Sequence, residues 1–505
     1  MKPQIPRLED FGISPEYGFL PPELPLLRLP NPYYAQWEAV ISNLQGLVLS
    51  KRLREVVLRL PVLSTEHLET DSEWRRAYVV LAFLSHAYIW GGDVPSEIVP
   101  PPISLPFLQV CRYLELPPVA TYASVVLWNW RPVFDNEPID TLSNLATLNT
   151  FTGSLDESWF YLVSVAIEAR AAPILPMMLD AISAARRGDT LVVTDCLRDF
   201  AERLDELGTL LQRMYENCDP HVFYHRIRPF LAGSSNMASA GLPNGVMFDT
   251  GVGPQSWVQF SGGSNAQSSI IQFFDLVLGV EHRPTGERAQ VSSLSSTSPG
   301  APSAPPAPSN NFILDMRKYM PGPHRRFLEH VASIANIKDF VTTHQHDRAL
   351  CTAYDASLAM LRAFRDKHIQ MVSRYIIVKS RETRSHERSS SSLTTPPAKL
   401  PQQRKINIAS ALDPTTGLKK DGLRGTGGTA LIPFLKQARD ETGEPAIDAW
   451  ARRLLGDAPT VGKTSFDFGG YRMAKTKESG SGEMEVVGLA GTWSVDDSEG
   501  GICHW

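Results

Sequence analysis

The chain has few cysteines, no excess of basic residues and no long apolar run. Its 505 residues include five cysteines, an odd number, and none of them stands in a CxxC spacing. A disulfide framework and a thiolate zinc site are therefore not supported, and a reducing, intracellular compartment is favoured. The 49 basic and 54 acidic side chains give a formal net charge of −5, which argues against bulk binding of nucleic acid.

Signals for targeting and for a membrane span are also missing from the sequence. The first residues, MKPQIPRLEDFGISPEYGF, have no apolar core and are interrupted by proline and acidic residues, unlike a secretory signal. The longest apolar stretch, 77–90, is too short and too interrupted to cross a bilayer. We therefore expect a cytoplasmic protein that binds neither membrane nor nucleic acid, with a monomer as the default state.

Length alone predicts roughly three domains, but the 39 prolines are unevenly distributed. Residues 283–310 include SSLSSTSPGAPSAPPAPSNN, which favours a solvated coil insertion. Residues 380–424 are rich in serine and basic side chains, and form either a surface loop or a lid over a site. The tail, 456–505, is rich in glycine, serine and acid, and we expect it to be disordered.

The remaining sequence predicts an all-α protein with two domains. Residues 1–145 would form a small, mainly helical N-terminal domain with a linker, and residues 146–455 a large helical domain. Apolar residues recur at i, i+3, i+4 and i+7 over 157–187 and 189–217. Further helices are expected at 266–280, 310–333, 346–377 and 429–441, whereas strand signals are sparse and isolated.

The helix expected over 354–377 holds the most informative polar residues. Its apolar stripe places Arg365 and His368 on or beside the inward face, where both need partners. His368 is either a core histidine bonded to a carbonyl or a ligand of a metal or haem iron. No second histidine, cysteine or acid follows it by three or four residues, so a metal here would bring most of its own ligands, as haem does.

Two other motifs leave alternatives open. The run CDPHVFYH (218–225) has the residue types of a metal cluster, but Phe223 and Tyr224 between its histidines indicate an aromatic pocket wall. The run GTGGT (425–429) precedes a short helix. A glycine-rich turn at a helix N-terminus can bind an anion through backbone N–H groups, and the same run also suits an ordinary flexible turn.

Eight motifs follow one another between about Phe11 and Ala438. They are SHAYIWGG (85–92), LPFLQVCRYLELPPVATYASVVLWNW (105–130), FYLVSVAIEA (160–169), VFYHRIRPFLAG (222–233), GGSNAQSSIIQFFDLVLGV (262–280), MRKYMPGPHRRFL (316–328), RDKHIQMVSRYI (365–376) and GTGGT (425–429). Together they resemble the indoleamine 2,3-dioxygenase family of haem enzymes. The resemblance implies haem b in the large helical domain.

On the proximal side of that haem, the resemblance assigns the iron ligand and its support. His368 matches the proximal ligand. Arg365 and Asp275 match a pair that supports the proximal helix and a haem propionate. Apart from this proximal group, the resemblance assigns Gly263 to Ala266 to the loop over the haem, with Ser264, Asn265 and Ala266 as cofactor-binding residues.

On the substrate side, the resemblance assigns an aromatic wall and an arginine. Phe223 matches the wall, and Arg228 matches the residue that grips the substrate carboxylate. Thr426, in the GTGGT run, matches the residue that closes the pocket near the substrate ammonium and a propionate. Three further positions that match the pocket lining are Tyr122, Phe160 and Ser164.

The implied reaction is O2-dependent cleavage of the indole C2–C3 bond of L-tryptophan to N-formyl-kynurenine, the first step of the kynurenine pathway toward NAD. It needs an electron donor that keeps the haem ferrous, and no residue as general acid or base. The chain departs from the family at Tyr224, where a second phenylalanine is common, and at Val125, often a cysteine. A haem-binding sensor with little turnover and a haem-free helical scaffold are the alternatives.

Overall fold

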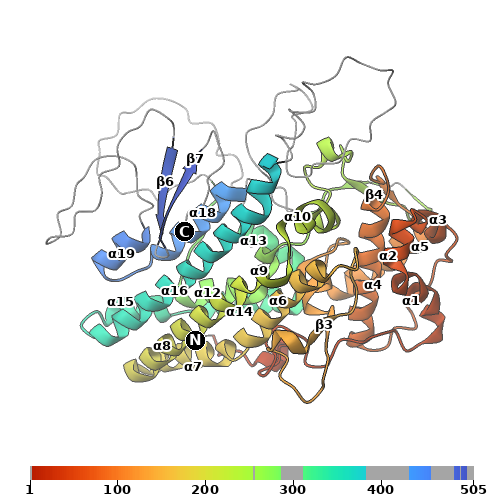
Figure 1. Cartoon of the computed structure of the whole chain (residues 1–505). Coiled ribbons are helices and arrows are strands. Elements are labelled where there is room, and N and C mark those ends of the chain that lie inside the picture. Colours follow the sequence, from red (N-terminus) through yellow and green to blue (C-terminus); the bar gives the residue numbers. More distant parts are fainter. Residues whose placement is uncertain are drawn as a thin grey trace, which may run out of the picture.

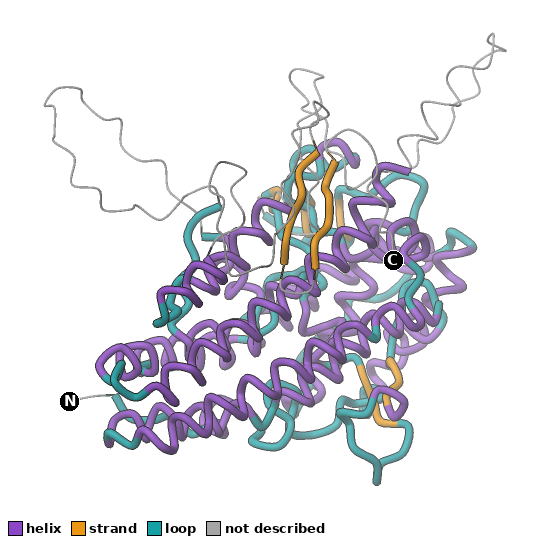
Figure 2. The backbone as a smooth tube through the Cα atoms, turned by 60° about the vertical axis from the view of Figure 1, so that its left-hand side comes forward, coloured by secondary structure: helices purple, strands orange, loops and turns teal. Residues whose placement is uncertain are grey.

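The computed structural model describes residues 3–253, 256–285, 311–382 and 431–456, together with the backbone of 483–488 and 491–496. The described chain is mostly helical, which confirms the all-α prediction. The strands are short beside the long helices (Figure 2). Most of the two predicted inserts, the GTGGT run with Thr426, and most of the tail lie outside the described residues.

The N-terminal part is built around a buried helix, α4 (Asp71–Trp90). Thr70 caps it by accepting a hydrogen bond from the backbone N–H of Glu73, a favoured way to satisfy a first-turn donor. Its residues from Ala77 to Ile89 are buried on every face. The apolar run noted at 77–90 is therefore the interior of a core helix. The shorter helices around it are α1 (Ala35–Ser42), α2 (Leu44–Leu49), α3 (Leu53–Leu58) and α5 (Pro101–Leu114).

The larger part begins with helices that the periodicity predicted. The expected helix 157–187 is divided by Pro173 into α6 (Leu155–Ala171) and α7 (Ile174–Arg187). Next come α8 (Thr190–Gln212) and the short α9 (Met214–Asn217). The stretch Leu155–Arg187 is long and apolar enough to cross a membrane, but 78% of its most apolar window is buried inside the fold. This is the pattern of a core helix.

The longest helix, α16 (Arg348–Val372), lies beside α8 along most of its length (Figure 1). Two buried hydroxyls fix its position: Ser357 donates to the carbonyl of Leu197 in α8 (2.8 Å), and Tyr354 donates to the carbonyl of Leu278 (2.6 Å). The other helices of this part are α12 (Ser269–Leu278), α13 (Phe312–Met316), α14 (Gly322–Ile334), α15 (Ile337–Thr343), α18 (Leu431–Gly443) and α19 (Ala449–Gly456).

The part of the chain that the structure describes contains three turns of π-helix. They are Ala123–Leu127 (η3), Phe223–Ile227 (η5) and Ser373–Val378 (η9). The second lies between the short helices α10 (Pro220–Val222) and α11 (Arg228–Leu231), and the third continues α16. Such turns are rare and frequently lie at functional sites.

The strands form small sheets at the periphery. β1 (Ile98–Val99) pairs in parallel with β4 (Val246–Phe248), which pairs antiparallel with β5 (Trp257–Val258). β2 (Trp130–Pro132) and β3 (Leu145–Thr147) form an antiparallel pair. In the tail, β6 (Glu483–Gly488) and β7 (Gly491–Asp496) form a hairpin. The β-branched residues of these two runs are the sequence signal for the hairpin. The expectation of disorder over 456–505 as a whole stays a prediction, because most of that range lies outside the described residues.

The N-terminal segment packs on the larger part of the protein. The carbonyl of Pro3 accepts a hydrogen bond from Arg186 of α7 (2.6 Å), and Phe11 packs edge-on against Phe327 of α14, with ring centroids 5.5 Å apart. The buried apolar side chains from Leu8 onward form one continuous core cluster. The predicted division into domains at residue 145 stays a prediction.

Two glycines allow a close crossing of chain segments above α12. A Cβ atom on Gly262 would lie 2.2 Å from the carbonyl oxygen of Leu231, and one on Gly233 would lie 2.2 Å from that of Phe260. Both glycines are therefore required sterically, and the crossing fixes the loop at residue 263 against the end of α11.

We expect Gly262→Ala to destabilise the fold by about 1–3 kcal/mol, because the added methyl forces two backbones apart. Thermal or urea unfolding measures the loss. Gly46→Ala is the matched control, since nothing lies within 4 Å of a Cβ there and alanine stabilises a helix relative to glycine. Equal effects of the two substitutions would contradict the steric explanation.

Candidate functional site

A cavity of about 250 Å³ lies between α6, η3, η5, the loop 263–268, α12, α16 and α18. Side chains from all three π-turns border it. Its walls are mainly apolar, with a few polar groups, as in pockets that bind small molecules. The predicted site residues that border it are Tyr122, Phe160, Ser164, Phe223, Arg228, Ser264, Asn265, Ala266, Asp275, Arg365 and His368.

Among the described residues that line the cavity, His368 is the one histidine. Its ring is half-buried because one side borders the cavity, and burial, with a smaller effect of the Arg365 charge, lowers its pKa to about 4. The imidazole is therefore neutral at pH 7 and retains a lone pair that can bind a metal. No group of three potential metal-binding side chains occurs among the described residues, so a metal at His368 needs ligands of its own.

The Arg365 guanidinium forms an ion pair with Asp275 in which one nitrogen, Nη2, donates to both carboxylate oxygens, at 2.7 and 2.8 Å. Burial favours the neutral form of Asp275, but the charges of Arg365 and His282 outweigh it and lower the pKa of this carboxyl. Arg365 also donates a hydrogen bond to the hydroxyl of Thr442 in α18. The pair thus holds a cation at the cavity wall, one turn of α16 from His368.

Another part of the lining is aromatic and contains a buried cation. The rings of Phe160 and Phe223 lie 4.8 Å apart, centroid to centroid, and the ring of Tyr375 meets Phe223 edge-on at 5.6 Å. Arg228 is 1% exposed, lies 5.7 Å from the ring centroid of Tyr224, and has its pKa lowered by burial. An arginine beside a dry, apolar cavity suits an anionic ligand group with two acceptor oxygens.

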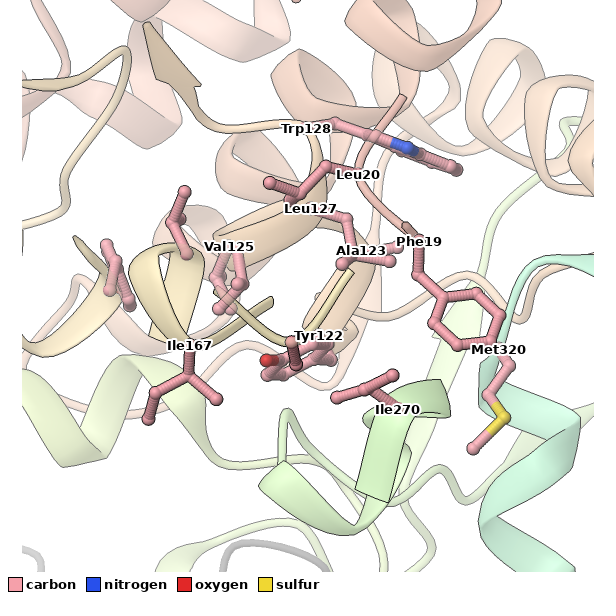
Figure 3. Packing of buried hydrophobic residues seen from close by; sticks show 14 of the residues in the cluster. Phe19, Leu20, Tyr122, Ala123, Val125, Leu127, Trp128, Ile167, Ile270 and Met320 are labelled. Carbon is pink, nitrogen blue, oxygen red and sulfur yellow. The ribbon is translucent and has the colours of Figure 1, made fainter. Parts of the chain in front are cut away.

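The structure adds a buried acid that the sequence analysis missed. Glu168 of α6 accepts hydrogen bonds from the hydroxyls of Tyr122 (3.0 Å) and Ser268 (2.7 Å), and both of these residues border the cavity. Figure 3 shows Tyr122 with Ile167 of α6 on one side and Ile270 of α12 on the other. Burial raises the pKa of Glu168 to about 7, and no described residue donates to its Oε2. The sequence signal that could have identified Glu168 is the presence of one acidic residue in the otherwise apolar run 160–169.

A second missed residue, His86 of α4, connects two walls of the cavity. Its Nε2 accepts a hydrogen bond from the backbone N–H of Ala120 (2.8 Å), so its Nδ1 carries the proton and donates to the carbonyl of Phe230 (2.8 Å). Burial lowers the pKa of His86 to about 4, so the ring stays neutral. This contact sets the spacing between the chain that leads to Tyr122 and the short helix that begins at Arg228.

Hydrogen bonds also fix the loop 261–268. Gln267 accepts from the backbone N–H of Tyr122 and donates to the carbonyl of Gly262, each at 2.9 Å. The backbone N–H of Ser261 donates a hydrogen bond to the hydroxyl of Tyr319 (2.9 Å). His225, the last residue of the run 218–225, is exposed, whereas Phe223 and Arg228 are buried.

Comparisons with known proteins show the family of the chain. Residues 7–445 match the family model described as indoleamine 2,3-dioxygenase. The chain is 40% identical over 459 residues to an indoleamine 2,3-dioxygenase of Saccharomyces cerevisiae, covering 88% of this chain and 94% of the relative. It is 31% identical over 450 residues to indoleamine 2,3-dioxygenase 2 of Homo sapiens, covering 88% and 97%. A 6-hydroxytryptophan 2,3-dioxygenase of Fusarium equiseti is 37% identical over 437 residues, covering 86% and 96%.

Replacing Glu168 by glutamine should change how stability depends on pH. The folded protein holds the Glu168 proton up to about pH 7, whereas the unfolded chain releases it near its ordinary pKa of 4.5. Between these values the wild type should lose up to about 3 kcal/mol relative to Glu168→Gln, with no further loss above pH 7. Urea unfolding at a series of pH values measures the difference.

The control is Glu202→Gln, because Glu202 is exposed on α8. This variant should follow the wild type across the whole pH range. If Glu168→Gln and the wild type also show parallel curves, Glu168 is ionised in the fold and the assignment is wrong.

Proposed function

The chain belongs to the indoleamine 2,3-dioxygenase family, and we propose that it cleaves the C2–C3 bond of L-tryptophan with O2. Members of this family are haem-dependent dioxygenases, and the chain is therefore one as well. The product would be N-formyl-kynurenine, which retains both oxygen atoms. The observation that supports this most is a neutral histidine and a buried arginine that both border one apolar cavity.

The residues around His368 fit haem b. The neutral imidazole offers iron a nitrogen ligand without first losing a proton. Arg365 provides a paired cation at the cavity wall that suits a propionate, and apolar side chains of α12, α16 and α18 suit the macrocycle. Ferrous haem bound there would supply the chemistry that makes O2 reactive toward an indole.

The chain's own contribution is to bind and orient the substrate in a dry cavity. Arg228 would form two parallel hydrogen bonds with the substrate carboxylate. Phe160 and Phe223 would enclose the indole ring, with Tyr122 and Ser164 completing the wall. The predicted partner Thr426 lies outside the described residues, and we propose that it contacts the substrate ammonium. No side chain needs to act as general acid or base, because the reaction adds O2 without loss of atoms.

The pathway, the compartment, the oligomeric state and the electron donor also belong to this proposal. We place the reaction at the start of the kynurenine pathway toward NAD, in the cytoplasm, with a monomeric protein and a separate electron donor for the haem iron. The relative named for 6-hydroxytryptophan makes substituted tryptophans the main competing substrates. A haem-binding sensor is the competing function, and the buried Arg228 favours the enzyme because a sensor of diatomic gas needs no carboxylate ligand.

The direct test is to supply the haem-loaded, reduced protein with L-tryptophan and O2. We expect N-formyl-kynurenine, and we expect His368→Ala to lose stable haem binding and with it the product. The Soret band measures haem content, and product absorbance measures turnover. Full haem loading without product from tryptophan or 6-hydroxytryptophan would favour the sensor, and normal haem binding by His368→Ala would contradict the ligand assignment.

Arg228→Ala should retain haem but lose affinity for carboxylate-bearing substrates. Removing one member of a buried charged pair costs roughly 2–5 kcal/mol, so kcat/KM for tryptophan should fall by roughly 30-fold or more. Tryptamine, which lacks the carboxylate, should be affected much less by the same substitution. Arg228→Lys is the control that retains charge without the planar fork. Equal losses for tryptophan and tryptamine would show that Arg228 does not bind the carboxylate.

A further inference from the structure

Four charged side chains meet beside the cavity: His282, Asp275, Glu441 and Arg365. Asp275 and Arg365 border it, whereas His282 and Glu441 do not. We call them the His282 junction. His282 follows α12, Asp275 lies within it, Arg365 is on α16 and Glu441 is on α18. The side chains of His282, Asp275 and Glu441 are 6, 6 and 4% exposed. The sequence analysis singled out only Asp275 and Arg365, and placed the start of a coil insertion directly after His282.

The geometry of the junction requires two N–H donors on the His282 ring. Nδ1 lies 2.7 Å from Oε2 of Glu441, and Nε2 lies 3.1 Å from Oδ2 of Asp275. Both partners are acidic side chains, and both have a pKa held below its ordinary value, so they are ionised. A neutral imidazole has one N–H and would leave one carboxylate facing a lone pair. The contacts therefore fit an imidazolium.

Among the four side chains of the junction, the charges balance when His282 is an imidazolium. Asp275 and Glu441 contribute two negative charges, and Arg365 contributes one positive charge. Loss of the His282 charge would leave a net negative charge in a buried site, which is costly because water cannot screen it. His282 is thus the member on which the neutrality of the junction depends.

The junction fixes one end of a helix whose other end forms the cavity wall. Leu431, Phe434 and Leu435 in the first part of α18 border the cavity and are half-buried. Its last part contains Glu441, Thr442 and Gly443, all buried. Glu441 also accepts from the backbone N–H of Arg283 (3.1 Å).

Further contacts hold α18 independently of His282. Gln437 donates to the carbonyls of Arg283 and Pro284, and Arg439 pairs with Asp366 of α16 (3.2 Å). Loss of the His282 contact should therefore loosen α18 without detaching it.

We propose that His282 is a positioning residue that couples α18 to the Asp275–Arg365 pair and thereby sets the shape of the cavity. His282 itself does not border the cavity, so it acts through α18 and through Asp275. The consequence for turnover depends on the function proposed above, whereas the coupling of α18 to His282 does not.

The coupling has a defined pH dependence. Burial lowers the pKa of His282, but Asp275 and Glu441 outweigh burial and raise it above 6.5, against a smaller opposing effect of Arg365. Other charged groups face the junction. Arg283 pairs with Glu444 and also lies 3.9 Å from Glu441. Arg317 interacts electrostatically with Asp275, and Glu281 pairs with Lys338 of α15. A raised histidine pKa means that the stabilisation is complete below pH 6.5 and is lost as pH rises through the folded value.

The test compares His282→Gln, Glu441→Gln and the double variant by hydrogen–deuterium exchange of residues 431–443, corrected for the intrinsic pH dependence of exchange. In the wild type, protection of α18 should fall as pH rises above 6.5. In His282→Gln, exchange should be roughly tenfold faster at pH 6 and show no such step. The double variant, which restores neutrality, should exchange more slowly than His282→Gln.

His346→Gln is the matched control, because His346 is exposed in the loop before α16; it should retain the wild-type step. With haem and tryptophan, His282→Gln should raise KM roughly fivefold and change kcat less than twofold, since the cavity shape changes but the groups that line it do not. Wild-type protection with an unchanged pH step in His282→Gln would overturn the proposal. A wild type that shows the α18 step but makes no N-formyl-kynurenine would overturn the proposed function alone.

Discussion

Helix α16 buries several charged side chains, and their need for partners of opposite charge constrains the fold. Arg362, Arg365 and Asp366 all lie in the interior or at the cavity wall, where an unpaired charge costs several kcal/mol. Each has a partner from another element: Asp440 and Arg439 of α18 for Arg362 and Asp366, and Asp275 of α12 for Arg365. His368 is different. Desolvation keeps it neutral, and no described residue forms a hydrogen bond with its ring, so its lone pair remains free for a ligand.

This arrangement explains why α12 and α18 take their positions beside α16. Neither helix is long, and their contact with α16 includes ion pairs and the Arg365–Thr442 hydrogen bond. Apolar side chains at the start of α18, together with Ile271 of α12, border the cavity, whereas the other apolar side chains of α12 pack in the core. The same ionic contacts therefore satisfy the buried charges and leave an apolar chamber next to a neutral histidine, which is the environment that a haem requires.

The sequence predicted the helices that follow a regular period and the site residues that belong to recognisable motifs. It predicted α8 and α16 well because their apolar stripes are long, and it missed the break before Ile174 because the stripe continues through Pro173. Glu168, His86 and His282 were missed for one reason. Their partners lie far away in sequence: Glu168 binds Ser268, His86 binds Phe230 and His282 binds Glu441. No local pattern reveals such pairs. The π-turns were missed because a single wide turn barely disturbs the apolar period.

Those π-turns have a consequence for how the pocket can change over evolutionary time. A π-turn contains one residue more than the α-helical turn it replaces, so losing one residue there returns the helix to regular geometry without breaking it. Each residue of an α-helix advances the side chains by about 100°. A one-residue deletion in η5 would therefore rotate Phe223 relative to Arg228. Substrate preference in such a pocket can shift by insertion and deletion as readily as by substitution, while the surrounding core keeps its packing.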